Sequence, residues 1–135
     1  MAIARDCDLG IDVELPRTVE RDVATNYFAR REIGELEGLA PELWLDGFFR
    51  CWTRKEAFIK ATGDGLERPL DSFVVPLRDG DGPYAVEAAQ GTGGDLGKWS
   101  LLPFRLAGGA IGAVCAELGH TPATLQWRQT PDAEH

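Results

Sequence analysis

The spacing of hydrophobic and polar positions changes twice along this chain and separates strand-like ends from a helical middle. Two short apolar runs, Met1–Ala4 and Leu9–Leu15, are broken by charged residues and predict a hairpin or two neighbouring strands. Strand-like runs return after residue 71, separated by glycine-rich turns, at Ser72–Leu77, Tyr84–Ala88, Lys98–Leu106, Ala110–Leu118 and Leu125–Gln129. We therefore predict an α+β fold, in which an antiparallel sheet packs against a long helix and one or two shorter helices.

The middle of the chain follows helical spacing. Apolar positions from Val19 onward predict a helix over residues 19–31, with Thr18 as its N-cap, and Glu32–Gly38 predicts a further short turn. Pro41 suits the first position of a long helix that runs to Thr62. Gly63 and Gly65 follow directly, so we expect this helix to end with a glycine cap.

Length and composition narrow the class of protein. A chain of 135 residues with 44% hydrophobic residues predicts one domain, over residues 1–129, with a frayed tail at 130–135. The formal charge of −8 argues against nucleic acid or an anionic membrane as the main partner. Cys7, Cys51 and Cys115 are widely spaced and predict small core residues rather than a disulfide framework or a zinc site. No apolar run is long enough for a bilayer span and no leader pattern precedes the domain, so we expect a cytoplasmic protein.

Glu56 occupies an unexpected position in the long helix. The apolar stripe of this helix consists of Leu45, Phe48, Phe49, Trp52 and Ile59, at the spacing of a core-facing helix. Glu56 falls on the same stripe. A carboxylate at a core-facing position is costly unless something pairs with it. We therefore expect Glu56 to face a cation or another polar group.

A second pair of carboxylates suggests what Glu56 faces. Asp12 and Glu14 are two residues apart on a predicted strand, so both side chains point to one face of it. This face is either an ordinary solvated one or a site where a cation separates the like charges. A magnesium ion bound by Asp12, Glu14 and Glu56 would explain both anomalies, because Mg²⁺ takes few protein carboxylates and completes its shell with water and phosphate oxygens.

Two lysines near Glu56 fit the same hypothesis. Lys60 lies four residues after Glu56 and shares its helix face, and Lys55 flanks it, so both are candidates for binding phosphate. An ordinary surface pair between Glu56 and Lys60 is the alternative. Other chemistries lack support, because the chain has neither a Walker loop nor a dinucleotide fingerprint, and no serine lies in a Gly-x-Ser-x-Gly context.

Two segments together resemble the paired signature of the 4'-phosphopantetheinyl transferase superfamily, of the surfactin-synthetase-activating type. They are GIDVE at 10–14 and FFRCWTRKEAFIKATGDGL at 48–66. The resemblance implies transfer of 4'-phosphopantetheine from coenzyme A to a serine of an acyl or peptidyl carrier protein. It also implies that Asp12, Glu14 and Glu56 bind Mg²⁺, that Lys55 and Lys60 bind the phosphates of coenzyme A, and that Glu56 and Lys60 are catalytic. In that role Glu56 is the candidate general base for the carrier serine.

The resemblance extends over the C-terminal half of the surfactin type only. That half lacks the family's Ser-His motif and the basic residues that hold the adenosine 3'-phosphate. We therefore expect either a homo-oligomer, a dimer or trimer, in which another subunit replaces the N-terminal half, or a catalytically incomplete half that needs a partner chain or only binds coenzyme A. A magnesium-dependent phosphohydrolase is a more distant alternative. Five arginines are candidates for a basic patch that meets an acidic carrier protein, namely Arg17, Arg21, Arg30, Arg31 and Arg50.

Overall fold

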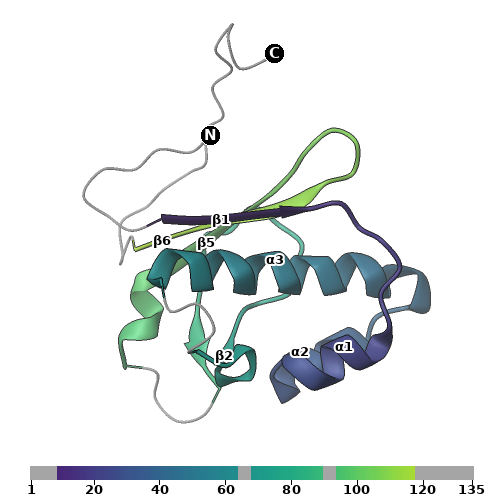
Figure 1. Ribbon diagram of the computed structural model, residues 1–135, viewed down its shortest axis with the longest axis horizontal. Helices are drawn as coiled ribbons and strands as arrows, with labels where there is room; N and C mark the ends of the chain where they lie inside the picture. The colour runs from purple at the N-terminus through teal and green to yellow at the C-terminus, as the bar shows by residue number, and fades with distance from the viewer. Residues whose placement is uncertain (1–8, 64–67, 90–93, 118–135) are drawn as a thin grey trace, which may run out of the picture.

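The computed structural model describes residues 9–63, 68–89 and 94–117 (Figure 1). The first part consists of β1 (Leu9–Glu14), α1 (Arg21–Tyr27), α2 (Arg30–Glu37), the 3₁₀ helix η1 (Pro41–Leu43) and the long helix α3 (Trp44–Thr62). The second part consists of η3 (Leu70–Ser72), β2 (Phe73–Val74), β3 (Tyr84–Ala85), β4 (Glu87–Ala88), η4 (Gly94–Lys98), β5 (Trp99–Arg105) and β6 (Ile111–Glu117). None of the helices in these ranges combines the length and apolar character that crossing a bilayer requires.

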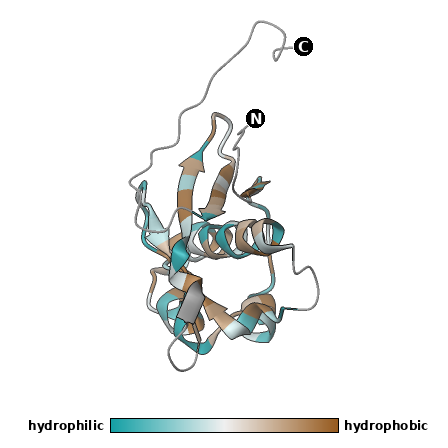
Figure 2. Ribbon diagram, turned by 90° about the vertical axis from the view of Figure 1, so that its left-hand side faces the viewer, coloured by the Kyte–Doolittle hydropathy of each residue, from teal (hydrophilic) through white to brown (hydrophobic). Residues whose placement is uncertain are grey.

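The main sheet has the strand order β1-β6-β5-β3, and each neighbouring pair in it is antiparallel. A separate antiparallel pair joins β2 to β4. Helix α3 lies between the main sheet and the α1–α2 pair (Figure 1). Figure 2 shows hydrophobic positions along the strands of the sheet and on the helices beside it. The predicted α+β architecture is confirmed.

The central place of α3 explains its burial. Phe48, Phe49 and Ile59 are buried as their spacing predicts, but Cys51 and Phe58, which point elsewhere around the helix, are also fully buried. A helix between two layers has no wide solvent face, so its hydrophobic stripe identifies only part of its contacts. Cys51 and Cys115 are free thiols in the core, as predicted, and Cys7 lies outside the described residues.

The predicted helix over residues 19–31 is wrong, because the chain breaks it in two. Phe28 and Ala29 both have extended backbone angles between α1 and α2. Phe28 is buried and stacks on Phe48 at 5.3 Å between ring centroids. The Ala29 N–H then donates to Oε1 of Glu32 at 2.9 Å, which begins α2. Thr18 is not an N-cap, since α1 begins after Glu20, and no side chain caps it.

The ends of the long helix are close to the prediction. Pro41 stands at the first position of η1, one short 3₁₀ turn before α3 begins, rather than in α3 itself. Gly63 caps the C-terminus with φ of 74°, a left-handed conformation that favours glycine. The second predicted glycine, Gly65, lies outside the described residues.

The predicted strand at 84–88 is divided in the structure into β3 and β4, which belong to different sheets. The predicted strand at 72–77 is shorter, because side chains take the place of strand partners after β2. Val75 donates its N–H to Glu32 Oε2 at 2.8 Å, and the Leu77 carbonyl accepts from Arg50 Nε at 2.9 Å. The strands β5 and β6 match their predictions to within one residue at each end. Met1–Ala4 and Leu125–Gln129 lie outside the described residues, as does the predicted tail.

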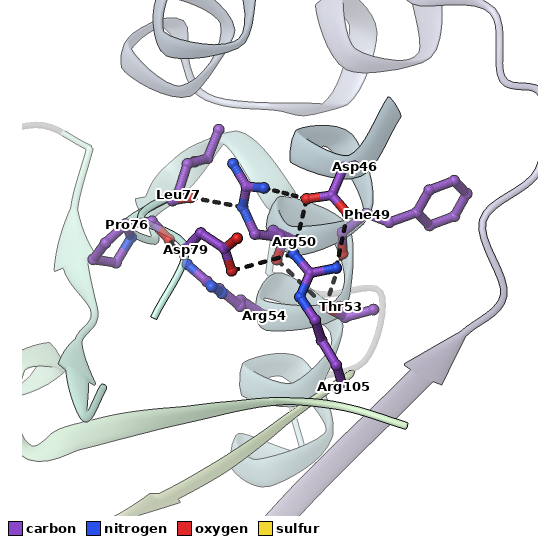
Figure 3. A network of polar contacts seen from close by, with 9 residues as sticks. All are labelled: Asp46, Phe49, Arg50, Thr53, Arg54, Pro76, Leu77, Asp79 and Arg105. Atoms are coloured by element: carbon purple, nitrogen blue, oxygen red, sulfur yellow. Dashed lines mark hydrogen bonds and ion pairs between the residues drawn. The ribbon is translucent and has the colours of Figure 1, made fainter. Parts of the chain in front are cut away.

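A charged network fixes the N-terminal half of α3 against β5 (Figure 3). Arg105 Nη1 and Nη2 donate to the two carboxylate oxygens of Asp46, at 2.8 and 2.9 Å, and Arg105 also contacts Asp79 at 3.2 Å. These donors and Arg50 hold the pKa of Asp46 below its ordinary value. A bidentate pair of this kind sets the orientation of the helix as well as its position.

The close approach of β1 to α3 depends on Gly10. A Cβ atom at this position would lie 2.1 Å from the Ala57 carbonyl oxygen and 2.4 Å from the Ala61 backbone nitrogen. We expect Gly10→Ala to lower the free energy of unfolding by about 3 kcal/mol, because backbone cannot move aside as a flexible side chain can. Urea denaturation with the wild-type chain as reference measures this difference.

Gly34→Ala is the matched control for this variant. A Cβ atom at Gly34 would meet nothing within 4 Å, and the residue lies inside α2. We expect this variant to be about 0.5–1 kcal/mol more stable than the wild type, because alanine favours the helix. Equal stability of Gly10→Ala and Gly34→Ala would contradict the packing of β1 on α3.

Candidate functional site

The candidate site lies where β1 passes over the C-terminal half of α3. Asp12 pairs in register with Ala113, and Glu14 with Ile111, and both of these partners belong to the core on the α3 side of the sheet. Asp12 is only 7% exposed. The predicted alternation of β1 is therefore correct, but the interpretation of a solvated face is wrong for Asp12.

Lys60 connects the helix to the strand at this point. Its Nζ donates to Asp12 Oδ1 at 2.8 Å and to the Ile11 carbonyl at 3.3 Å. The Lys60 side chain remains 51% exposed. Among the described residues the ion pair of Lys60 is thus with Asp12 on the strand, and the alternative of a surface pair with Glu56 is wrong.

The three carboxylates influence one another electrostatically. Burial is the main cause that raises the pKa of Asp12, and Glu14 raises it further, whereas Lys60 opposes both effects. Burial also raises the pKa of the partly buried Glu56, and the charges of Asp12 and Glu14 add to this shift while Lys60 counteracts it. Glu14 forms a further ion pair with Arg17 at 3.1 Å. Asp12, Glu14, Glu56 and Lys60 therefore share one environment, as the sequence predicts.

One oxygen of this group has no partner. Asp12 Oδ2 is buried and makes no hydrogen bond with the described residues. A buried carboxylate oxygen without a donor is costly, and a hard cation is a suitable partner for it. The oxygen donors of Asp12, Glu14 and Glu56 therefore fit Mg²⁺ by type. In the described ranges they do not form a ready group of three converging ligands. This suits an ion that takes most of its shell from water and phosphate.

Lys55 lies elsewhere, contrary to the expectation that it would flank the phosphates beside Lys60. It is fully buried, with its Nζ 2.9 Å from Glu32 Oε1. It donates to the carbonyls of Leu70 and Phe73, and its Nζ is 4.0 Å from the centroid of the Phe73 ring. One step along a helix rotates the side chain by about 100°, and at Lys55 this rotation leads into the protein.

Glu32 is the residue whose importance the hydrophobic pattern understates. It is fully buried and accepts hydrogen bonds from the backbone of Ala29 and Val75 as well as the ion pair from Lys55. The spacing in the sequence was a signal, since Glu32 lies four residues after Phe28 and four residues before Leu36. All three side chains are buried in the structure. This is the same anomaly of a carboxylate on an apolar stripe that singled out Glu56.

Most of the five arginines proposed as a basic patch contact a carboxylate or an aromatic ring of the chain itself. Arg17 pairs with Glu14, Arg31 with Glu87 at 2.7 Å, and Arg50 with Asp46. Arg21 lies over the Trp44 ring, 4.8 Å from its centroid. Paired arginines contribute little net positive potential, so the docking of an acidic partner on such a patch stays a prediction.

The raised pKa of Glu56 leads to a pH-dependent effect on stability. A folded state that binds this proton more tightly than the unfolded state loses stability as the pH rises above the ordinary value of 4.5. We therefore expect Glu56→Gln to have a higher melting temperature than the wild type at pH 7.5 in metal-free buffer. The difference should shrink as the pH falls towards 4.5, because the raised pKa lets the folded wild type take up a proton at Glu56 over this range. A constant difference across this pH range would show that the charge of Glu56 is not its cause.

Comparison with known proteins assigns the chain to a family. The family described as the 4'-phosphopantetheinyl transferase superfamily matches residues 8–115. A 4'-phosphopantetheinyl transferase of Bacillus subtilis is 40% identical over 83 residues, which cover 62% of this chain and 37% of the relative. The 4'-phosphopantetheinyl transferase HetI of Nostoc sp. is 42% identical over 96 residues, covering 70% of this chain and 37% of HetI.

The solved structures include a similar fold. The holo-[acyl-carrier-protein] synthase of Thermotoga maritima superposes with a TM-score of 0.58 at 18% identity, over 84% of this chain and 64% of that chain. The present chain spans little more than a third of the length of the two curated relatives. The match over residues 8–115 includes β1 and α3, which carry the candidate site, and it shows that this chain belongs to the 4'-phosphopantetheinyl transferase superfamily.

Proposed function

We propose that this chain provides the metal-binding part of a 4'-phosphopantetheinyl transferase. The reaction is the Mg²⁺-dependent transfer of 4'-phosphopantetheine from coenzyme A to a serine of an acyl or peptidyl carrier protein. The main support is the cluster on β1 and α3. There Asp12 Oδ2 is buried with no partner among the described residues, Lys60 lies 2.8 Å from Asp12 Oδ1, and burial raises the pKa of Glu56.

Each residue of the cluster has a proposed task. Asp12, Glu14 and Glu56 hold the ion, which when bound neutralises charge on the pyrophosphate of coenzyme A. Lys60, half exposed, places a second positive charge beside the phosphates. Glu56 accepts the proton of the carrier serine, whose oxygen attacks the β-phosphorus as the bond to the bridging oxygen breaks and adenosine 3',5'-bisphosphate leaves.

A second candidate function follows from the length of the chain. It spans about 37% of the relatives quoted above, so a catalytically incomplete half that needs a partner chain or only binds coenzyme A is the alternative. The face of β1 that points away from α3 offers a place for such a partner, since Val13 is 40% exposed and the following Leu15 is 63% exposed. We propose a second copy of this chain, in a dimer or trimer, as the first partner to test. The cytoplasmic location stays a prediction.

The test is a direct transfer assay. The purified chain is incubated with coenzyme A, Mg²⁺ and several apo carrier proteins, and intact mass spectrometry follows the carrier. We expect the carrier to gain the mass of phosphopantetheine, and we expect EDTA to prevent this gain. No gain with any carrier would contradict a self-sufficient enzyme. A gain only after addition of a separately expressed N-terminal half would support the incomplete half.

Light scattering separates the remaining possibilities. Activity together with a dimeric or trimeric mass would support shared sites. Activity of a monomer would contradict them, because one chain would then supply the whole site.

A further inference from the structure

Lys60 pairs with one of the carboxylates that the proposed function assigns to a metal ion. Its ammonium group lies 2.8 Å from Asp12 Oδ1, and it also donates to the Ile11 carbonyl at 3.3 Å. The other Asp12 oxygen, Oδ2, is buried and has no hydrogen-bond partner in the part of the chain that the structure describes. The carboxylate thus has one oxygen paired with an organic cation and one oxygen still lacking a donor.

The two side chains of this ion pair differ in solvent exposure. Asp12 is held on β1 at 7% side-chain exposure, whereas the Lys60 side chain is 51% exposed. An ammonium on a flexible four-carbon stem can leave one acceptor and reach another within the same region. An ion pair this exposed on one side is weak, so a divalent ion can displace it.

We propose that Lys60 is a substitute cation, which holds Asp12 until a divalent ion arrives and then passes to the phosphate oxygens of the ligand. This inference rests on the proposed function. It makes metal and phosphate binding cooperative, because the ion releases the lysine that the phosphate needs. It also accounts for the finding that the three carboxylates do not converge in the described residues.

A fixed lysine provides the competing explanation, and the two make different predictions. A positive charge that stays at Asp12 weakens metal binding and strengthens phosphate binding independently, so its removal leaves the coupling between the two ligands unchanged. A lysine that changes partners contributes to the coupling itself. The coupling between metal and phosphate, rather than either affinity, therefore decides between them.

The first experiment measures this coupling. Mn²⁺ binding is followed by electron paramagnetic resonance with and without inorganic pyrophosphate, for the wild type, Lys60→Met and Lys98→Met. Lys98 is the matched control, because it is a 45% exposed lysine paired with Glu117 at 3.8 Å, away from the site. We expect Lys60→Met to bind Mn²⁺ alone about two- to fivefold more tightly. Pyrophosphate should enhance the Mn²⁺ affinity of both proteins, but the enhancement factor of Lys60→Met should be about two- to fivefold smaller than that of the wild type. Lys98→Met should match the wild type in both measurements.

The second experiment observes the lysine in the unaltered protein. The chain contains only three lysines, Lys55, Lys60 and Lys98. Nuclear magnetic resonance of ¹³Cε-labelled lysine should therefore resolve Lys60 from two internal references. We expect Mg²⁺ alone to shift the Lys60 signal, pyrophosphate to shift it again, and the buried Lys55 signal to stay in place.

The outcomes separate this inference from the proposed function. Mn²⁺ binding with equal coupling in the wild type and Lys60→Met, or an unchanged Lys60 signal at saturating Mg²⁺, would overturn the inference and leave the metal site standing. If the wild type and both variants fail to bind Mn²⁺, even with pyrophosphate, the metal site and the inference are overturned together.

Discussion

Replacement of Glu56 by glutamine is expected to lower the rate of phosphopantetheine transfer by at least about a hundredfold. The variant keeps the size of the side chain but removes the proposed proton acceptor and one of three carboxylates for the ion. General base catalysis by itself contributes about 10²–10⁴ in rate. The measurement is the initial rate of mass gain by an apo carrier protein at saturating coenzyme A and Mg²⁺.

Glu37→Gln is a suitable control, because Glu37 is an exposed glutamate at the end of α2. We expect it to retain the wild-type rate. The folded state of Glu56→Gln is checked independently by its expected higher melting temperature at pH 7.5, so that loss of activity is not confused with loss of structure. A Glu56→Gln rate within about threefold of the wild type, far below the contribution of a general base, would remove Glu56 from the proposed mechanism.

Lys55→Met is expected to lower the free energy of unfolding by about 3–5 kcal/mol, the usual effect of removing one partner of a buried ion pair. The variant leaves the carboxylate of Glu32 fully buried without its cation. It also removes the donor to the carbonyls of Leu70 and Phe73. These contacts join α2, η3 and β2 to α3, at the residue that precedes Glu56. Urea denaturation measures the loss.

The comparison variant is Lys98→Met, which breaks an exposed pair with Glu117 at 3.8 Å. We expect a loss of no more than about 1 kcal/mol there. The effect of Lys55→Met should also depend on pH. Burial already raises the pKa of Glu32 in the wild type, and Lys55 opposes this rise. Removing Lys55 raises the folded-state pKa further, so the variant loses more stability than the wild type as the pH rises, and the two differ more at pH 8 than at pH 5. Similar losses for Lys55→Met and Lys98→Met would contradict a structural role of the buried pair.

Lys55 and Lys60 show how far a sequence pattern can define a site. Both were expected beside the phosphates, because both are basic residues near Glu56. The structure pairs Lys60 with Asp12 and buries Lys55 against Glu32. Periodicity states which residues share a face of a helix, but not what lies opposite that face. In a helix with packing partners on several sides, this second question decides the role of each charge.

The break between α1 and α2 has a similar cause. Residues 19–31 have acceptable helical spacing, yet Phe28 packs against Phe48 and the backbone of Ala29 binds Glu32. Local propensity differs by only a fraction of a kcal/mol per residue, and the burial of one aromatic side chain exceeds it. The short strands β2 and β4 follow the same rule, because Glu32 and Arg50 take backbone groups that a longer strand pair would use.

The sequence by itself determined the features that depend on local geometry. These are the strand that places Asp12 and Glu14 on one face, the long helix that carries Glu56 and Lys60, its glycine cap at Gly63, and the paired motifs that mark the family. Only the tertiary structure decided that Asp12 is buried, that Lys60 rather than Lys55 meets it, and that Glu32 is a core residue. Those facts depend on contacts between segments about 20 to 50 residues apart, whose energies no local pattern contains.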